Sequence, residues 1–185
     1  MDAPVTDPHR PASSDDRAVP GDAPTGEDAL HVRRAWELAL ENVEDGGRPF
    51  GCVVVEASTG EVLAEARNQV AQTGDKTAHA EVVAIRELAA EGRDTLEGCD
   101  VYVTAYPCPM CLGALYYAAP RRIVFGATRE QEDEHYEDGN DLFRLRTFYD
   151  EFAKAPADRA LRAVQVQPQD PTRPFRAFTA RHGDA

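Results

Sequence analysis

The chain has few lysines, few cysteines and no long apolar run among its 185 residues. Only two lysines are present, and the formal net charge is −13. Nucleic-acid affinity rests largely on Lys and Arg that neutralise phosphates, so this balance disfavours a polyanionic partner. The absence of a long apolar run excludes a membrane-spanning helix. Four cysteines do not indicate a disulfide framework, and no signal peptide is expected, so we predict a cytoplasmic protein.

The length and the 42% hydrophobic content predict one compact domain with a tail. Residues 1–26 are rich in Pro, Asp, Ser and Ala and have no hydrophobic periodicity, which predicts a disordered leader. Residues 27–185 then form the predicted folded domain.

Helical and strand-like patterns alternate along this domain. Such alternation predicts an α/β sandwich with one mostly parallel sheet. Helices are predicted over 27–45, 78–91, 109–117, 142–152 and 175–180, strands over 50–56, 61–66, 100–104, 122–126 and 161–167, and a long acidic loop over 130–141.

The most informative motif is His79-Ala80-Glu81 followed by Pro107-Cys108-Pro109-Met110-Cys111. One imidazole and two thiolates make a three-ligand zinc site with a fourth position open for water, as in hydrolytic zinc enzymes. Glu81 is placed to move protons beside the metal. This pairing is the signature of zinc-dependent nucleobase deaminases.

Each half of the motif also occurs in other settings. A lone C-x-x-C is found in redox pairs and in structural zinc sites. A redox pair needs no histidine, however, and a structural site needs a fourth Cys or His at ligand spacing. Cys52 and Cys99 sit beside apolar, β-prone runs and are interpreted as small buried residues. The two halves together therefore favour catalytic zinc.

The predicted helices place these residues in a favourable environment. His79 and Glu81 fall at the start of one helix, and Cys108 and Cys111 at the start of another. Helix N-termini carry partial positive charge, which lowers a cysteine's pKa toward the thiolate that zinc requires. With Glu81 passing a proton to the ring nitrogen and the leaving ammonia, the arrangement predicts hydrolytic deamination.

From about Leu30 onward the chain resembles the cytidine deaminase-like superfamily, and within it most closely the bacterial guanine deaminases. The segments that match are 47–54, 77–82 and 107–114. The C-terminal third, at 148–152, 154–157 and 174–178, is similar to the guanine deaminase ending and differs from the tRNA adenosine deaminases.

The resemblance implies a three-layer αβα sandwich around a five-stranded mixed, mostly parallel sheet, a bound zinc ion and a homodimer. In guanine deaminases the C-terminal segment, here from about residue 142, can exchange between subunits. By position, the zinc ligands would be His79, Cys108 and Cys111, and Glu81 would be the proton shuttle. The residues that contact the base would be Asn68, Phe50 and Asp141, and Asp138 is the second candidate for the position of Asp141. Tyr106 stands at the edge of the pocket where relatives usually carry glutamate.

Several of these residues have simpler interpretations as well. Asn68 can be a turn residue, Phe50 a core aromatic, and Asp141 or Asp138 a solvated acid.

The leading hypothesis is conversion of the free base guanine to xanthine and ammonia. Deamination of another small amidine (a nucleoside, cytosine or an aminotriazine), editing of tRNA adenosine and a catalytically silent zinc domain remain alternatives, although the charge and the C-terminal third oppose the tRNA substrate.

Overall fold

A mixed four-stranded sheet forms the centre of the computed structural model, which describes residues 24–137, 139–140, 143–144, 148–161, 163–166 and 169–182. The strand order is β2-β1-β3-β4. β1 pairs antiparallel with both β2 and β3, whereas β3 pairs parallel with β4. The strands are β1 Gly51–Glu56, β2 Val62–Arg67, β3 Cys99–Ala105 and β4 Arg122–Ala127.

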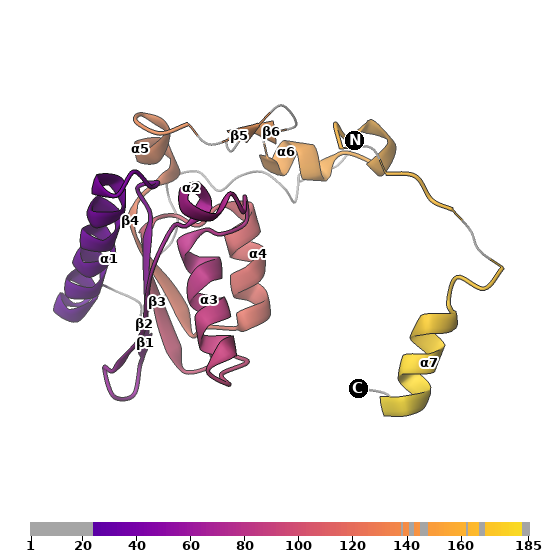
Figure 1. Cartoon of the computed structure of the whole chain (residues 1–185), viewed down its shortest axis with the longest axis horizontal. Coiled ribbons are helices and arrows are strands. Elements are labelled where there is room, and N and C mark those ends of the chain that lie inside the picture. The colour runs from indigo at the N-terminus through magenta and orange to yellow at the C-terminus, as the bar shows by residue number, and fades with distance from the viewer. Residues whose placement is uncertain are drawn as a thin grey trace, which may run out of the picture.

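Helices cover both faces of the sheet (Figure 1). α1 (Gly26–Glu44) lies on one face, and α3 (Ala80–Ala90) and α4 (Pro109–Ala118) lie side by side on the other. The predicted three-layer αβα arrangement is therefore confirmed. The short helix α2 (Val70–Thr73), which the sequence pattern did not predict, leads from β2 toward α3.

Alternation along the strands divides the core into two layers. In β1, Cys52 and Val54 pack with residues of α3 and α4, whereas Val53 and Val55 pack with α1. Because successive strand side chains point to opposite faces, one short apolar run supplies both layers.

α1 approaches the start of β1 very closely. Its N-terminus is fixed by a capping box between Thr25 and Asp28. Further along, a Cβ atom at Gly51 would overlap the carbonyl oxygen of Ala35, so only glycine fits there. The contact sets the position of the loop that enters β1.

The sheet is mixed, as predicted, but the prediction of five strands that are mostly parallel is wrong for the part of the chain that the structure describes. The sheet has four strands, and only the β3–β4 pair is parallel. Residues 163–166, within the predicted strand 161–167, belong to no strand, and Val164 and Val166 are 86% and 81% exposed. An alternating apolar pattern forms a strand only where a neighbouring strand accepts its backbone hydrogen bonds.

The C-terminal third also departs from the prediction. The helix predicted over 142–152 is wrong in its first part, since residues 143–144 pair with 139–140 and the helix α6 covers Phe148–Ala153. In the predicted acidic loop, α5 forms at Arg129–Asp133 because Thr128 and Gln131 make a capping box. The remaining short elements are β5 Gly139–Asn140, β6 Phe143–Arg144 and η2 Pro156–Asp158.

The last helix, α7 (Arg173–His182), confirms the predicted helix over 175–180 and stands apart from the sandwich (Figure 1). Phe175 and Phe178 are exposed on it. Of the helices in the described ranges, none has both the length and the apolar character needed to cross a membrane. The predicted leader lies almost wholly outside the described residues, and α1 begins at Gly26.

Candidate metal centre and active site

Two helix N-termini bring the motif residues together. His79 is the N-cap of α3 and Cys108 is the N-cap of α4, with Pro109 in the first turn of that helix. Since α3 and α4 lie side by side, these two caps meet at one end of the sandwich. The Nδ1 atom of His79 lies 3.6 Å from the Sγ atom of Cys108.

Cys111 completes a set of three metal-binding side chains. The ligand atoms of His79, Cys108 and Cys111 all lie within 4.8 Å of one another. Zinc bonds of about 2.3 Å to sulfur and about 2.0 Å to nitrogen place tetrahedral S and N ligands about 3.5 Å apart. The separation of 3.6 Å between His79 and Cys108 is close to this distance. The three residues therefore fit one zinc ion with a fourth position left over.

The two thiols differ in acidity. Hydrogen bonding from the Cys111 thiol, assisted by His79 and the Cys111 amide, lowers the pKa of Cys108 to about 4 despite its burial. The same hydrogen bond and burial raise the pKa of Cys111. The Sγ atom of Cys108 also accepts the Cys111 amide N–H at 3.5 Å, and this bond favours the thiolate form that zinc requires.

Glu81 lies in the first turn of α3, two residues after His79, and is 8% exposed. Burial raises the pKa of its carboxyl, partly opposed by hydrogen bonds from its own amide and from Cys111. A carboxyl group with a raised pKa beside a metal site can take up and return a proton near neutral pH.

Asn68 and Phe50 are joined where β2 ends and β1 begins. The backbone N–H of Asn68 donates to the carbonyl of Phe50 at 3.0 Å. The Asn68 side chain is fully buried, and its Oδ1 accepts the Val70 N–H at 3.0 Å. Its Nδ2 has no hydrogen-bond partner among the described residues. A buried donor left unpaired costs about 1–3 kcal/mol, which makes it a candidate for bonding to a ligand.

Phe50 has the core role that its sequence allowed, and its contact with a base stays a prediction. It packs against the core cluster under α3 and also meets the ring of Tyr136 edge-on, with centroids 4.9 Å apart. The hydroxyl of Tyr136 accepts a 3.0 Å hydrogen bond from Arg48. Sequence analysis missed Tyr136, because a tyrosine in an acidic loop carries no local signal of this contact.

Tyr106 is tied to β4 and to the C-terminal segment. Its ring meets Phe125 edge-on, with centroids 5.1 Å apart, and the guanidinium of Arg129 lies 4.6 Å from its centroid. Arg129 also lies over Tyr149 of α6 at 4.9 Å and donates to its hydroxyl at 3.1 Å. Arg129, another residue that the sequence did not single out, thus joins the start of the P-C-x-x-C segment to α6.

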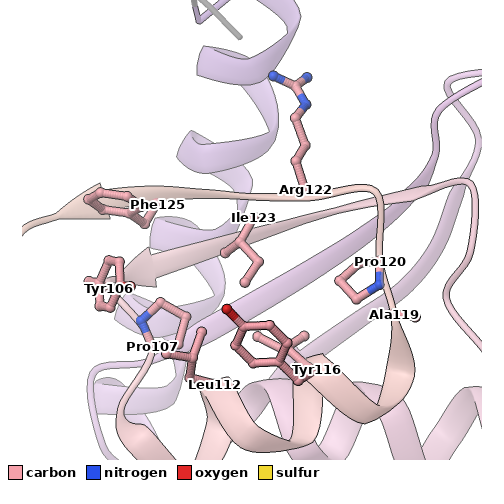
Figure 2. A pocket seen from close by; sticks show the side chains of 10 residues that line it. Tyr106, Pro107, Leu112, Tyr116, Ala119, Pro120, Arg122, Ile123 and Phe125 are labelled. Atoms are coloured by element: carbon pink, nitrogen blue, oxygen red, sulfur yellow. The ribbon is translucent and has the colours of Figure 1, made fainter. Parts of the chain in front are cut away.

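A hollow of about 490 Å³ lies between α4 and β4 (Figure 2). Tyr106 and Phe125 stand together at one end of it, and Tyr116 borders its middle. Arg122 points away from the hollow toward α1, where it pairs with Asp28. The hollow follows the β4 edge of the four-stranded sheet and is mainly apolar.

Two predicted base contacts, Asp141 and Asp138, lie outside the described residues. Their contact with a base stays a prediction, as does that of Tyr106.

Comparison with known proteins places the chain in a family. Residues 25–127 match the cytidine and deoxycytidylate deaminase zinc-binding region. The chain belongs to this deaminase family. It is accordingly a zinc-dependent hydrolytic deaminase acting on a cyclic amidine, with His79, Cys108 and Cys111 as the group that can hold the metal.

The deaminase has relatives with different substrates. Guanine deaminase of Bacillus subtilis is 38% identical over 149 residues, which cover 80% of this chain and 90% of the relative. The X-ray structure of that enzyme matches with a TM-score of 0.75 and 34% identity, covering 85% of this chain and 96% of the other. A tRNA-specific adenosine deaminase of Agrobacterium fabrum is 41% identical over 97 residues, 49% of this chain and 62% of the relative.

Proposed function

We propose that this deaminase converts the free base guanine to xanthine and ammonia. The observation that carries the proposal is the extent of the likeness to guanine deaminase, which covers 80% of the chain, whereas the tRNA enzyme matches 49%. The net charge of −13 also disfavours a polyanionic substrate.

The proposed chemistry uses four residues. His79, Cys108 and Cys111 hold zinc, which when bound supplies the Lewis acidity that activates water near neutral pH. Glu81 accepts a proton from the attacking water and delivers protons to the ring nitrogen and to the departing amino group. One water is consumed and one ammonia is released, so the C–N bond of the exocyclic amine is replaced by a carbonyl.

We assign recognition of the base to residues other than the zinc ligands and Glu81. The unpaired Nδ2 donor of Asn68 suits an acceptor atom of the purine, and Phe50 walls the ring with its face. The amidine edge of guanine carries N–H donors, which require an acceptor. We propose Asp141 as this acceptor and Asp138 as the second candidate. We also propose Tyr106 at the edge of the pocket, since it comes directly before the Pro107-Cys108 segment.

We further propose a cytoplasmic homodimer in which the C-terminal segment from about residue 142 exchanges between subunits. Support comes from exposed apolar side chains on this segment, at Val164, Val166, Phe175 and Phe178. The edge of β4, which pairs with no further strand among the described residues, and the hollow beside it offer an apolar surface that can receive these side chains. The four free cysteines suit a reducing compartment.

A direct test is ammonia release by the zinc-loaded protein from guanine, guanosine, adenine, adenosine, cytosine, cytidine and ammeline. Turnover of guanine above all others supports the proposal. Preference for another small base would support the deamination reaction and identify a different substrate. If no compound of the panel releases ammonia and inosine forms in tRNA, the second candidate, tRNA adenosine, would replace guanine as the substrate.

A further inference from the structure

Asn42 is a polar residue on the buried side of α1. It is 1% exposed and follows Ala35, Leu38 and Ala39 on the stripe of α1 that packs against the sheet. A buried amide is tolerated in such a position only when its polar atoms are hydrogen-bonded.

Both N–H groups and the oxygen of the Asn42 side chain are hydrogen-bonded, and the partners lie in three segments. Nδ2 donates to the carbonyls of Arg48 and Asn68, each at 2.8 Å. Oδ1 accepts from Nε2 of Gln72 at 2.9 Å. The orientation of the amide is fixed by these partners, because a flipped amide would place its oxygen against two carbonyl oxygens.

Both carbonyls belong to the loops that carry the proposed base contacts. Asn68 is itself one contact, and Arg48 lies two residues before Phe50. The side chain of Arg48 also holds the hydroxyl of Tyr136, whose ring meets Phe50. Asn42 therefore connects, through one amide group, the two loops that wall the base.

The backbone around Asn42 is fitted to this arrangement. The N–H of Gly47 donates to the carbonyl of Asn42 at 2.6 Å. A Cβ atom at Gly47 would overlap the Asn42 amide, so glycine is needed for the chain to pass it. The position of the Asn42 amide relative to the loop that enters β1 is therefore fixed.

We infer that Asn42 is a positioning residue for substrate recognition, acting through Asn68 and Phe50 rather than through the metal ligands. The inference rests on the proposed function, since it takes those two residues as the base contacts. Loss of the Asn42 amide lets the two loops move relative to each other, and the pocket for the base loses its fixed width.

The test compares full-length, zinc-loaded Asn42→Asp and Gln72→Ala with wild type, using guanine as substrate. Asn42→Asp keeps the shape and the oxygen that faces Gln72 but sets a carboxylate oxygen against two carbonyls. We expect KM to rise about 10-fold or more, kcat to fall less than KM rises, and zinc content to stay unchanged. Gln72→Ala, on the surface, removes one bond and should raise KM about 2- to 3-fold.

Tyr102→Phe is the matched control for a buried hydrogen bond at the opposite end of α1, where Tyr102 bonds Asp28 at 2.9 Å. It should lower the melting temperature and leave KM unchanged. The inference is overturned if both Asn42→Asp and Gln72→Ala keep the wild-type KM, or if KM rises equally in Tyr102→Phe.

The wild-type measurement separates the two proposals. Turnover of guanine by wild type with an unchanged KM in the variants rejects the role of Asn42 alone. Turnover of a different base rejects guanine, and the same variants then decide on Asn42 with that base. A wild type without activity on any base overturns both.

Discussion

The imidazole Nδ1 of His79 lies 3.6 Å from the Sγ of Cys108, although 29 residues separate them and each caps a different helix. The fold achieves this by laying α3 and α4 side by side on one face of the sheet. Their N-termini both direct amide N–H groups and partial positive charge at the same point. The ligands are therefore assembled by helix packing as well as by the motif itself.

Removal of one thiolate should weaken zinc binding. In Cys108→Ser, we expect zinc content to fall below one per chain and activity to fall by at least about 100-fold, because three ligands are the minimum of this site. Zinc analysis and ammonia release measure the two effects. Cys52→Ser is the matched control, since Cys52 is fully buried but outside the ligand group. Full zinc content in Cys108→Ser would contradict the assigned ligand set.

Glu81→Gln should separate metal binding from proton transfer. The amide keeps the size of the side chain but cannot accept a proton, so kcat should fall by about 10²- to 10⁴-fold with zinc retained. Steady-state kinetics with zinc analysis provide the measurement. Glu87→Gln, an exposed carboxylate on the same helix, should behave as wild type. An unchanged kcat in Glu81→Gln would show that another group transfers the proton.

The metal centre was predictable because its residues are close in sequence to recognisable helix starts. His79 and Glu81 sit two residues apart, and Pro109 marks the first turn of α4. Asn42 also carried a signal that sequence analysis did not use. It falls three, four and seven residues after Ala39, Leu38 and Ala35, where an apolar residue is expected. A polar residue on a buried stripe indicates a hydrogen-bonding role.

Other features had no local signal. Arg48 and Tyr136 are 88 residues apart, so their hydrogen bond depends on the whole fold. The wrong strand at 161–167 has a similar cause. Val164 and Val166 alternate as strand residues do, but a strand also requires a neighbour, and the pattern cannot say where that neighbour is.

Arg129→Ala should loosen α6 from the body of the deaminase. The guanidinium lies between Tyr106 and Tyr149, and each cation–π contact is worth about 0.5–1 kcal/mol at an exposed site. We expect faster amide hydrogen exchange in α6 and little change in the sheet. Tyr106→Phe, which keeps the ring, is the control and should preserve protection. Unchanged exchange in Arg129→Ala would mean that other contacts hold α6.

Asp28 should make stability depend on acid pH. Burial disfavours its carboxylate, but hydrogen bonds from the Thr25 amide, Tyr102 and Arg122 outweigh this and lower its pKa to about 2. Because this value lies below the ordinary 3.8, the stabilisation is complete above about pH 4 and is lost as pH falls from about 4 to 2. At neutral pH the shift corresponds to about 2 kcal/mol.

Asp28→Asn should therefore lower the free energy of unfolding by about 2 kcal/mol at pH 7, and its deficit relative to wild type should shrink as pH falls from 4 toward 2. Urea unfolding of both proteins across this range measures the difference. Asp45→Asn removes an exposed pair with Arg67 and should cost no more than about 1 kcal/mol at pH 7. A deficit in Asp28→Asn that stays constant down to pH 2 would show that Asp28 stabilises α1 by packing and not by its charge. A shrinking deficit would instead show that the loss of stability in acid comes from the charge of Asp28, which pairs with Arg122 under the first turn of α1. This pair lies on the face of the sheet opposite the metal centre.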